Sequence, residues 1–209
     1  MPKKHELAPI ASPPGGDIAS RIGAAILGFL GEVPRSREQP SALPGEAARH
    51  VANRAATKAA TAAGTLALPP GPLGWLTILP EMVAVWKVQA AMVADIAGLY
   101  GKQASLTQEQ MLYCLFKHTA SQAVRDLVVR AGERWLVKQA TVGALQAIAR
   151  RIGARVSERA LTKTASRWLP VVGALGVAAY AYYDTAQVAK AAIELFEREF
   201  DVEPADESV

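Results

Sequence analysis

The stretch ILPEMVAVWKVQAAMVADIAGLY, residues 78–100, decides the fold class, because its apolar side chains recur with the period of an α-helix. Successive members of this apolar set are three or four residues apart, which places them on one side of a helix. They are Val85, Val88, Met92, Ile96 and Leu99. Gly101 follows directly and favours a helix end there. The pattern predicts one long helix over residues 78–100.

The segments on either side also predict helices. Asp17 is an N-cap residue ahead of an amphipathic segment, and Thr107 with Gln110 resembles a capping box. No stretch alternates apolar and polar residues over a sustained length, so no sheet is predicted. The fold class is therefore all-α, a helical bundle of six or seven helices joined by Gly/Pro-rich apolar turns. The predicted helices cover residues 17–30, 45–66, 78–100, 107–132, 133–153, 154–168 and 171–200.

Three segments divide the chain. Residues 1–44 predict an N-terminal amphipathic arm followed by a Pro-rich linker, because residues 31–44 hold three prolines and no apolar period. The arm is therefore expected to be tethered separately from the helical domain at residues 45–200. Residues 201–209 form an acidic C-terminal tail, and we expect residues 203–209 to be disordered or loosely attached.

The composition of the 209 residues is that of one ordinary domain with unevenly distributed charge. Hydrophobic residues make up 51%, which suits a packed core. The single cysteine excludes a disulfide framework and a site with several thiolate ligands, and it fits a reducing compartment. The last sixteen residues hold seven acidic residues and one arginine, for a charge of −6; the whole chain carries +4, so the rest carries +10. A basic body favours anionic partners such as phospholipid surfaces or nucleic acid.

Two uncharged stretches raise the question of membrane contact. Residues 59–80 reach transmembrane length, but four prolines and three glycines interrupt them, so a straight spanning helix is not expected. Residues 168–183 are also uncharged but are short for a span. A re-entrant or interfacial hairpin and burial inside the protein both stay open. The candidate residues for a membrane-contact turn are Leu68, Leu73, Trp75 and Leu76.

Two blocks of sequence resemble a known family. The first is GTLALPPGPLGWLTILPEMVAVWKVQAAMVADIAGLYG, residues 64–101, and the second is WLPVVGALGVAAYAYYDTAQVAKAAIELF, residues 168–196. The Gly/Pro-rich turn, the helix ending in A-x-x-Y-G and the P-x-x-G-A-x-x-G-A helix are similar to those of the EcsC family, over roughly residues 46–197. Where that family often has Asn-Tyr in the last helix, this chain has Tyr180, Tyr182 and Tyr183.

The resemblance implies a bacterial helical protein on the cytoplasmic side of the membrane, named for a gene beside an ABC transporter. It implies no established enzymatic role and supplies no catalytic residues.

Motifs for catalysis, metals and cofactors are absent from the sequence. The three histidines form neither an HExxH nor an ExxH pair, so no metal site is expected, and Glu46 with His50 is interpreted as an exposed helical pair. Cys114 lies on an apolar helix face and is interpreted as a packed thiol. His118 could touch it, but such a dyad would lack an orienting partner. No phosphate-binding loop is present, so we predict no cofactor and no enzymatic activity.

Three carboxylates are candidates for buried polar anchors. Glu81 and Asp95 are fourteen residues apart, close to four helical turns, and therefore share one helix face. They are either anchors in a pocket or structural groups, with Glu81 stabilised by the helix dipole in a first turn and Asp95 paired with a neighbouring arginine. The same two interpretations apply to Asp184.

A cationic segment is the sharpest functional feature of the sequence. Its basic residues repeat every four positions, so each step advances 40° beyond a full turn and the five span about 160° of helix surface. They are Arg151, Arg155, Arg159, Lys163 and Arg167. A basic amphipathic helix suits anionic membrane surfaces or phosphate-bearing ligands, and the alternative is a solvated face. Nucleic acid is not expected, because aromatic residues are only 6% and show no base-stacking pattern.

These observations lead to three functional hypotheses. The first is a non-enzymatic accessory or regulatory protein that binds anionic lipid, or a membrane protein, at the cytoplasmic face of the cell membrane. The second is a soluble interaction module that homo-oligomerises or docks a protein partner without lipid. The third, which the sequence favours least, is an enzyme that uses Glu81 or Asp95.

Overall fold

The computed structural model of the chain describes residues 15–31, 33–66, 74–131, 134–163, 170–198 and 200–203. Helices dominate them, which confirms the predicted all-α bundle with six or seven helices. The α-helices are α1 Gly15–Leu30, α2 Pro44–Leu66, α3 Gly74–Leu99, α4 Gln108–Phe116, α5 Ser121–Val124, α6 Val142–Lys163 and α7 Pro170–Phe196, with a 3-10 turn, η1, at Gln103–Ser105. The strands are β1 Val128–Ala131, β2 Arg134–Lys138 and β3 Phe200–Glu203.

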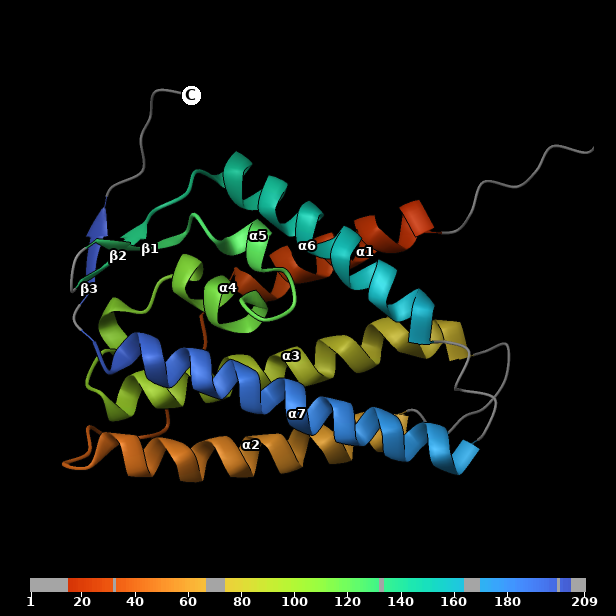
Figure 1. Cartoon of the computed structure of the whole chain (residues 1–209), viewed down its shortest axis with the longest axis horizontal. Coiled ribbons are helices and arrows are strands. Elements are labelled where there is room, and N and C mark those ends of the chain that lie inside the picture. The colour runs from red at the N-terminus through yellow and green to blue at the C-terminus, as the bar shows by residue number, and fades with distance from the viewer. Residues whose placement is uncertain are drawn as a thin grey trace, which may run out of the picture.

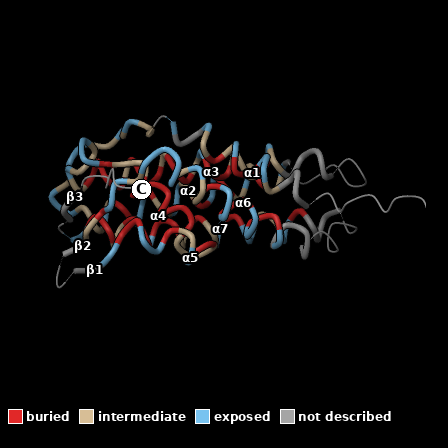
Figure 2. Tube along the Cα trace, turned by 90° about the horizontal axis from the view of Figure 1, so that it is seen from above, coloured by how far each residue is buried: buried red, intermediate tan, exposed pale blue. Residues whose placement is uncertain are grey.

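Two groups of long helices build the molecule. Helices α2, α3 and α7 pack on one another, with α2 running opposite to the other two, while α1 pairs with α6 (Figure 1). The short helix α4 lies between these groups and contacts α1, α3 and α7. Buried residues follow the interior of this arrangement (Figure 2). The main core draws on all seven α-helices and on β1 and β2, and a smaller cluster joins α2, α3 and α7.

Helix α4 begins as predicted and ends much earlier. The Thr107 side chain accepts a hydrogen bond from the Gln110 backbone N–H at 3.3 Å, and the Gln110 side-chain oxygen accepts one from the Thr107 N–H at 2.9 Å. This capping box confirms the predicted helix start. The helix stops at Phe116, so the prediction of a helix over residues 107–132 was wrong.

A small sheet takes the place of the first residues of the helix that was predicted over residues 133–153, and the segment is helical only from Val142, in α6. Strands β1 and β2 pair antiparallel, with Val128 opposite Val137, and β3 pairs parallel to β2, with Val202 opposite Val137. Val128 and Val137 are buried in the main core. The absence of any sheet was therefore predicted wrongly, because runs of four or five residues are too short for alternation to show.

The segments expected to lie outside the domain are attached to it. Ile22 and Ile26 of α1 are fully buried in the main core, so the predicted separately tethered arm is a core helix. At the other end, Phe200–Glu203 form β3, so Glu203, expected in a loosely attached tail, lies opposite Lys138 of β2. Residues 204–209 of that tail lie outside the described residues.

Glycines allow α1 and α6 to approach closely. A Cβ placed on Gly153 would lie 2.4 Å from the Ala19 carbonyl oxygen, and one on Gly23 would lie 3.3 Å from that of Ala149. Only hydrogen fits at such a backbone contact. Helix α6 runs without a break through Gly153, where the sequence predicts a boundary between two helices.

One helix among the described residues is long and apolar enough to cross a membrane by length and composition alone. It is the Leu79–Leu99 part of α3, and 61% of the most apolar stretch of this segment is buried inside the protein. Helix α3 also begins at Gly74, before the predicted start, and continues through Pro80. The burial identifies this segment as the central helix of the bundle.

Candidate functional site

The basic face of α6 is exposed where the structure describes its side chains. Arg151 and Arg155 are exposed as predicted, and Arg150, which the four-residue spacing does not include, is exposed beside them. Arg155 lies 3.3 Å from Glu158, and both side chains are more than half exposed. Within the described residues, Arg150 and Arg151 have no carboxylate partner.

Packing on α1 fixes which side of α6 is exposed. Ala149, Ile152 and Val156 are buried on the opposite side of the helix. Arg159 and Lys163 belong to the same helix, but their side chains lie outside what the structure describes. Arg167 lies outside the described residues. The described part of the predicted cationic fan is therefore Arg151 and Arg155, extended by Arg150.

An uncharged end of the bundle lies near the last turns of α6. The last turns of α2, the first turns of α3 and the first turns of α7 meet at one end of the long axis, to which α6 also runs (Figure 1). No charged residue occurs in residues 59–66, 74–80 or 170–183. We call this region the uncharged end.

Small residues bring the helices together at the uncharged end. Ala59 and Ala63 of α2, Val85 of α3 and Ala181 of α7 form the smaller core cluster. Of the predicted membrane-contact turn, Leu68 and Leu73 lie outside the described residues; Trp75 and Leu76 lie in the first turn of α3, without described side chains.

Asp184 lies in a buried polar cluster that joins three helices. Its Oδ1 lies 2.7 Å from Nε2 of His118, just after α4, and its Oδ2 accepts a hydrogen bond of 2.8 Å from Nε2 of Gln89 on α3. Gln89 also donates to the Thr185 hydroxyl at 3.2 Å, and that hydroxyl donates to the Ala181 carbonyl at 2.7 Å. The Asp184 side chain is 13% exposed. Asp184 therefore connects α7 to α3 and to the segment after α4 through hydrogen bonds.

Two buried atoms of this cluster, Gln89 Oε1 and His118 Nδ1, have no hydrogen-bond partner among the residues that the structure describes. The cluster combines a carboxylate, an imidazole, an amide and a hydroxyl group. The Thr185 hydroxyl donates its proton to a backbone carbonyl oxygen. The arrangement stabilises the contact between α3, α4 and α7, since a hydrogen-bonded buried group holds its neighbours in place.

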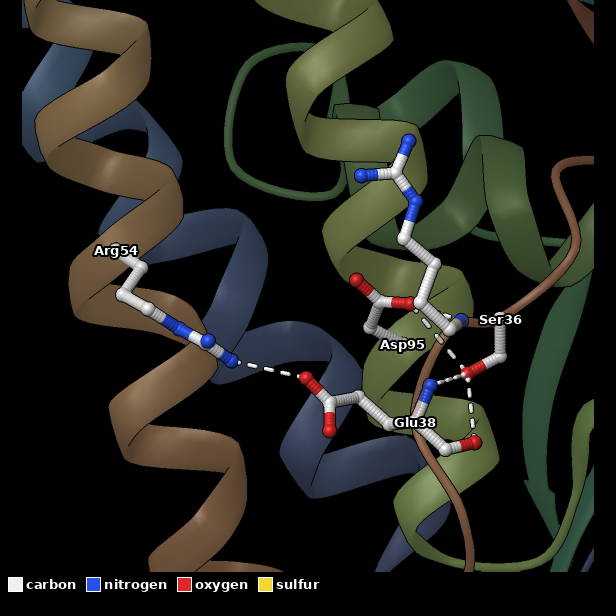
Figure 3. Close-up of polar contacts among 5 residues, drawn as sticks. Ser36, Glu38, Arg54 and Asp95 are labelled. Atoms are coloured by element: carbon white, nitrogen blue, oxygen red, sulfur yellow. Dashed lines mark hydrogen bonds and ion pairs between the residues drawn. The ribbon is translucent and has the colours of Figure 1, made fainter.

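Asp95 fastens the segment before α2 to the outside of α3. The carboxylate accepts a 2.8 Å hydrogen bond from the Arg37 backbone N–H and one of 3.4 Å from the Ser36 hydroxyl, while Glu38 pairs with Arg54 at 2.9 Å (Figure 3). The expected arginine side-chain partner is thus a backbone N–H instead. A Cβ on Gly98 would lie 2.1 Å from the Ser36 hydroxyl oxygen, so glycine is required at this contact. The predicted linker is therefore fixed to α3, and we call its residues 33–43 the strap.

Glu81 is buried, with 7% of its surface exposed. It is the eighth residue of α3 and lies beyond the first turn. The expected stabilisation by a first-turn helix dipole was therefore wrong, because that effect falls off within one turn.

The remaining candidates for chemistry are structural. Cys114 is fully buried, and burial raises the pKa of its thiol to about 12, so it is not a nucleophile at neutral pH. The ring nitrogen Nε2 of His118 pairs with Asp184, whereas the sequence left open a contact with Cys114. Glu46 and His50 are both exposed on α2. Among the described residues, no group of three or more metal-binding side chains occurs.

Comparison with known protein families identifies the family of the chain. The model of the EcsC protein family matches residues 35–198. The chain belongs to the EcsC protein family. In this EcsC chain the match begins in the strap and extends through α7, and α1 precedes it. No curated protein and no solved structure matches it.

Sequence reasoning found part of this site. It identified Arg151, Arg155 and Asp184 but missed Gln89 and His118 as partners of Asp184. The partners are 95 and 66 residues away in sequence, and no local spacing links them. A glutamine inside the apolar face of a core helix was the one available signal.

Proposed function

We propose that this EcsC family protein binds anionic membrane surfaces peripherally and acts there as an accessory or regulatory protein, on the cytoplasmic face of the cell membrane. The observation that carries the proposal is the combination of the uncharged end with the basic face of α6, which runs toward that end (Figure 1). Basic residues attract anionic headgroups, and uncharged helix ends lower the cost of entering the headgroup layer.

The size of the electrostatic contribution suits reversible binding. Each basic side chain near an anionic surface contributes about 1 kcal/mol, so three exposed arginines contribute about 3 kcal/mol at low salt. That is roughly a hundredfold in affinity. Because these side chains are exposed, the attraction falls as salt shortens the Debye length.

Reversing the charge of Arg150, Arg151 and Arg155 to glutamate is expected to abolish co-flotation with vesicles containing phosphatidylglycerol. The circular dichroism spectrum should stay unchanged, because all three side chains are exposed. The matched control reverses Arg35, Arg49 and Arg125, which are also exposed and give the same change in net charge. We expect the control to retain most of its binding. Equal losses in the two variants would show that net charge alone governs binding, and an unaffected first variant would make the α6 face a solvated one.

The alternative function is a soluble module that homo-oligomerises or docks a protein partner. The exposed apolar side chains on α7 favour it, since such residues also line helix interfaces. Analytical ultracentrifugation separates the two proposals: a stable dimer that does not float with vesicles supports the alternative.

A further inference from the structure

Helix α7 exposes a run of large apolar and aromatic side chains along its first half. Leu175 is 66% exposed, Tyr182 44% and Tyr183 61%. Gly176 and Ala179 are exposed between them, and the opposite side of the helix buries Ala174 and Ala181. From Leu175 to Tyr183 this face extends about 12 Å along the helix axis. We call it the α7 face.

The charged residues of α7 all lie in its second half. No charged residue occurs from Pro170 to Tyr183, and the next exposed residues on the same side include Lys190. Glu194, further along, pairs with Lys117 at 2.9 Å. The helix is therefore apolar where it joins the uncharged end and charged toward the other end of the bundle.

Helix α2, which packs on α7, exposes three threonine hydroxyl groups that are hydrogen-bonded within the helix. Thr57, Thr61 and Thr65 are exposed and one turn apart, and each hydroxyl donates to a carbonyl of the preceding turn, at 3.0, 2.9 and 2.9 Å. A threonine that bonds its own helix backbone hides its donor, so it loses little on leaving water. Two of these threonines lie in the uncharged end.

We propose that the α7 face is the surface that enters the bilayer, lying in the layer between lipid headgroups and acyl chains. This proposal rests on the proposed function and names its lipid-contacting surface. Tyrosine suits this layer because the ring is apolar and the hydroxyl still reaches water. Leu175 contacts the acyl chains, while the arginines of α6 contact headgroup phosphates.

A bilayer fits this face better than a second copy of the chain. The exposed aromatic side chains are tyrosines, which are typical of the bilayer interface, and the exposed threonines of α2 have internally satisfied donors. The basic residues of α6 also suit an anionic lipid surface. The apolar contact is short in range, so it persists at high salt once the protein is bound.

A fluorophore attached to the α7 face tests the proposal directly. In a Cys114→Ala background, Leu175→Cys is labelled with nitrobenzoxadiazole; the matched control is Gln146→Cys, exposed near the start of α6 and away from the uncharged end. With vesicles of phosphatidylglycerol and phosphatidylcholine, emission at position 175 should shift to shorter wavelength and rise several-fold. Lipids carrying a nitroxide just below the headgroup should quench it. The control should change little.

Each outcome bears on one claim. If the protein floats with vesicles but position 175 behaves like the control, the α7 proposal is overturned and the proposed function stands. If the protein does not float at all, both are overturned. A blue shift without vesicles that grows with protein concentration would assign the α7 face to a second copy. The variant Leu175→Glu with Tyr183→Glu, in surface positions that do not affect folding, should lose at least tenfold of the binding that remains at high salt.

Discussion

Replacing Asp184 by alanine is expected to lower the free energy of unfolding by about 2 to 4 kcal/mol. A buried group that loses its partner costs about 1 to 3 kcal/mol, and two groups lose one here. The groups are the Gln89 amide, which is fully buried, and the His118 imidazole. The sum stays below its upper limit because the Gln89 amide keeps the Thr185 hydroxyl as an acceptor and the His118 side chain is 20% exposed. For a chain of this length the melting temperature should fall by roughly 4 to 16 °C. Urea unfolding followed by circular dichroism measures the change.

The control for this prediction is Asp126→Ala. Asp126 pairs with Arg125 at 3.3 Å, but both side chains are more than three-quarters exposed, so we expect a change of no more than about 0.5 kcal/mol. Asp184→Asn keeps a side-chain acceptor, so its loss of stability should lie between those of the two alanine variants. Equal stability of the Asp184→Ala and Asp126→Ala variants would mean that the polar cluster does not hold α3, α4 and α7 together.

Replacing Gly153 by alanine is expected to destabilise the protein by about 1 to 3 kcal/mol, the usual cost of overpacking. The new Cβ would meet the Ala19 carbonyl at 2.4 Å, and backbone cannot yield as a flexible side chain can. Helix α1 would have to move away from α6 and expose Ile22 and Ile26. Hydrogen exchange in α1 should rise together with the loss of stability.

Gly176→Ala on α7 is the matched control, because nothing lies within 4 Å of its added Cβ. Alanine is favoured over glycine inside a helix by about 0.5 to 1 kcal/mol, so this variant should be more stable than the natural chain. The same substitution therefore has opposite signs at the two positions. A Gly153→Ala variant as stable as Gly176→Ala would restore the interpretation of residues 15–30 as a separate arm.

The helices of the bundle follow from local sequence signals, and this explains which parts were predictable. The apolar period of residues 78–100 and the capping box at Thr107 act within a few residues, and both are present as predicted. The sheet depends on pairing between Val137 and residues 9 and 65 positions away, which no local pattern encodes. Helix α1 was predicted to be a separate arm because the proline-rich segment that follows it was interpreted as a free linker. In the structure that segment packs on α3 at Asp95 and Gly98.

The candidate site was predictable to the same degree. The spacing of Arg151 and Arg155 along a helix correctly indicated an exposed basic face. The partners of Asp184 come from two other helices, so their assembly depends on the tertiary fold. The uncharged stretches at residues 59–80 and 168–183 were recognised in the sequence, which left a hairpin or burial open. The packing of α2, α3 and α7 brings them to one end of the bundle.

Flotation of the unaltered protein with vesicles of increasing phosphatidylglycerol content is the most direct test of membrane binding. The fraction of protein bound to vesicles should rise with the content of anionic lipid at about 0.1 M salt, where the Debye length is about 10 Å. At about 1 M salt, where it is about 3 Å, the bound fraction should fall but not vanish, because the α7 face contributes a salt-resistant part. A protein that stays at the bottom of the gradient at every lipid composition and salt concentration would contradict the account.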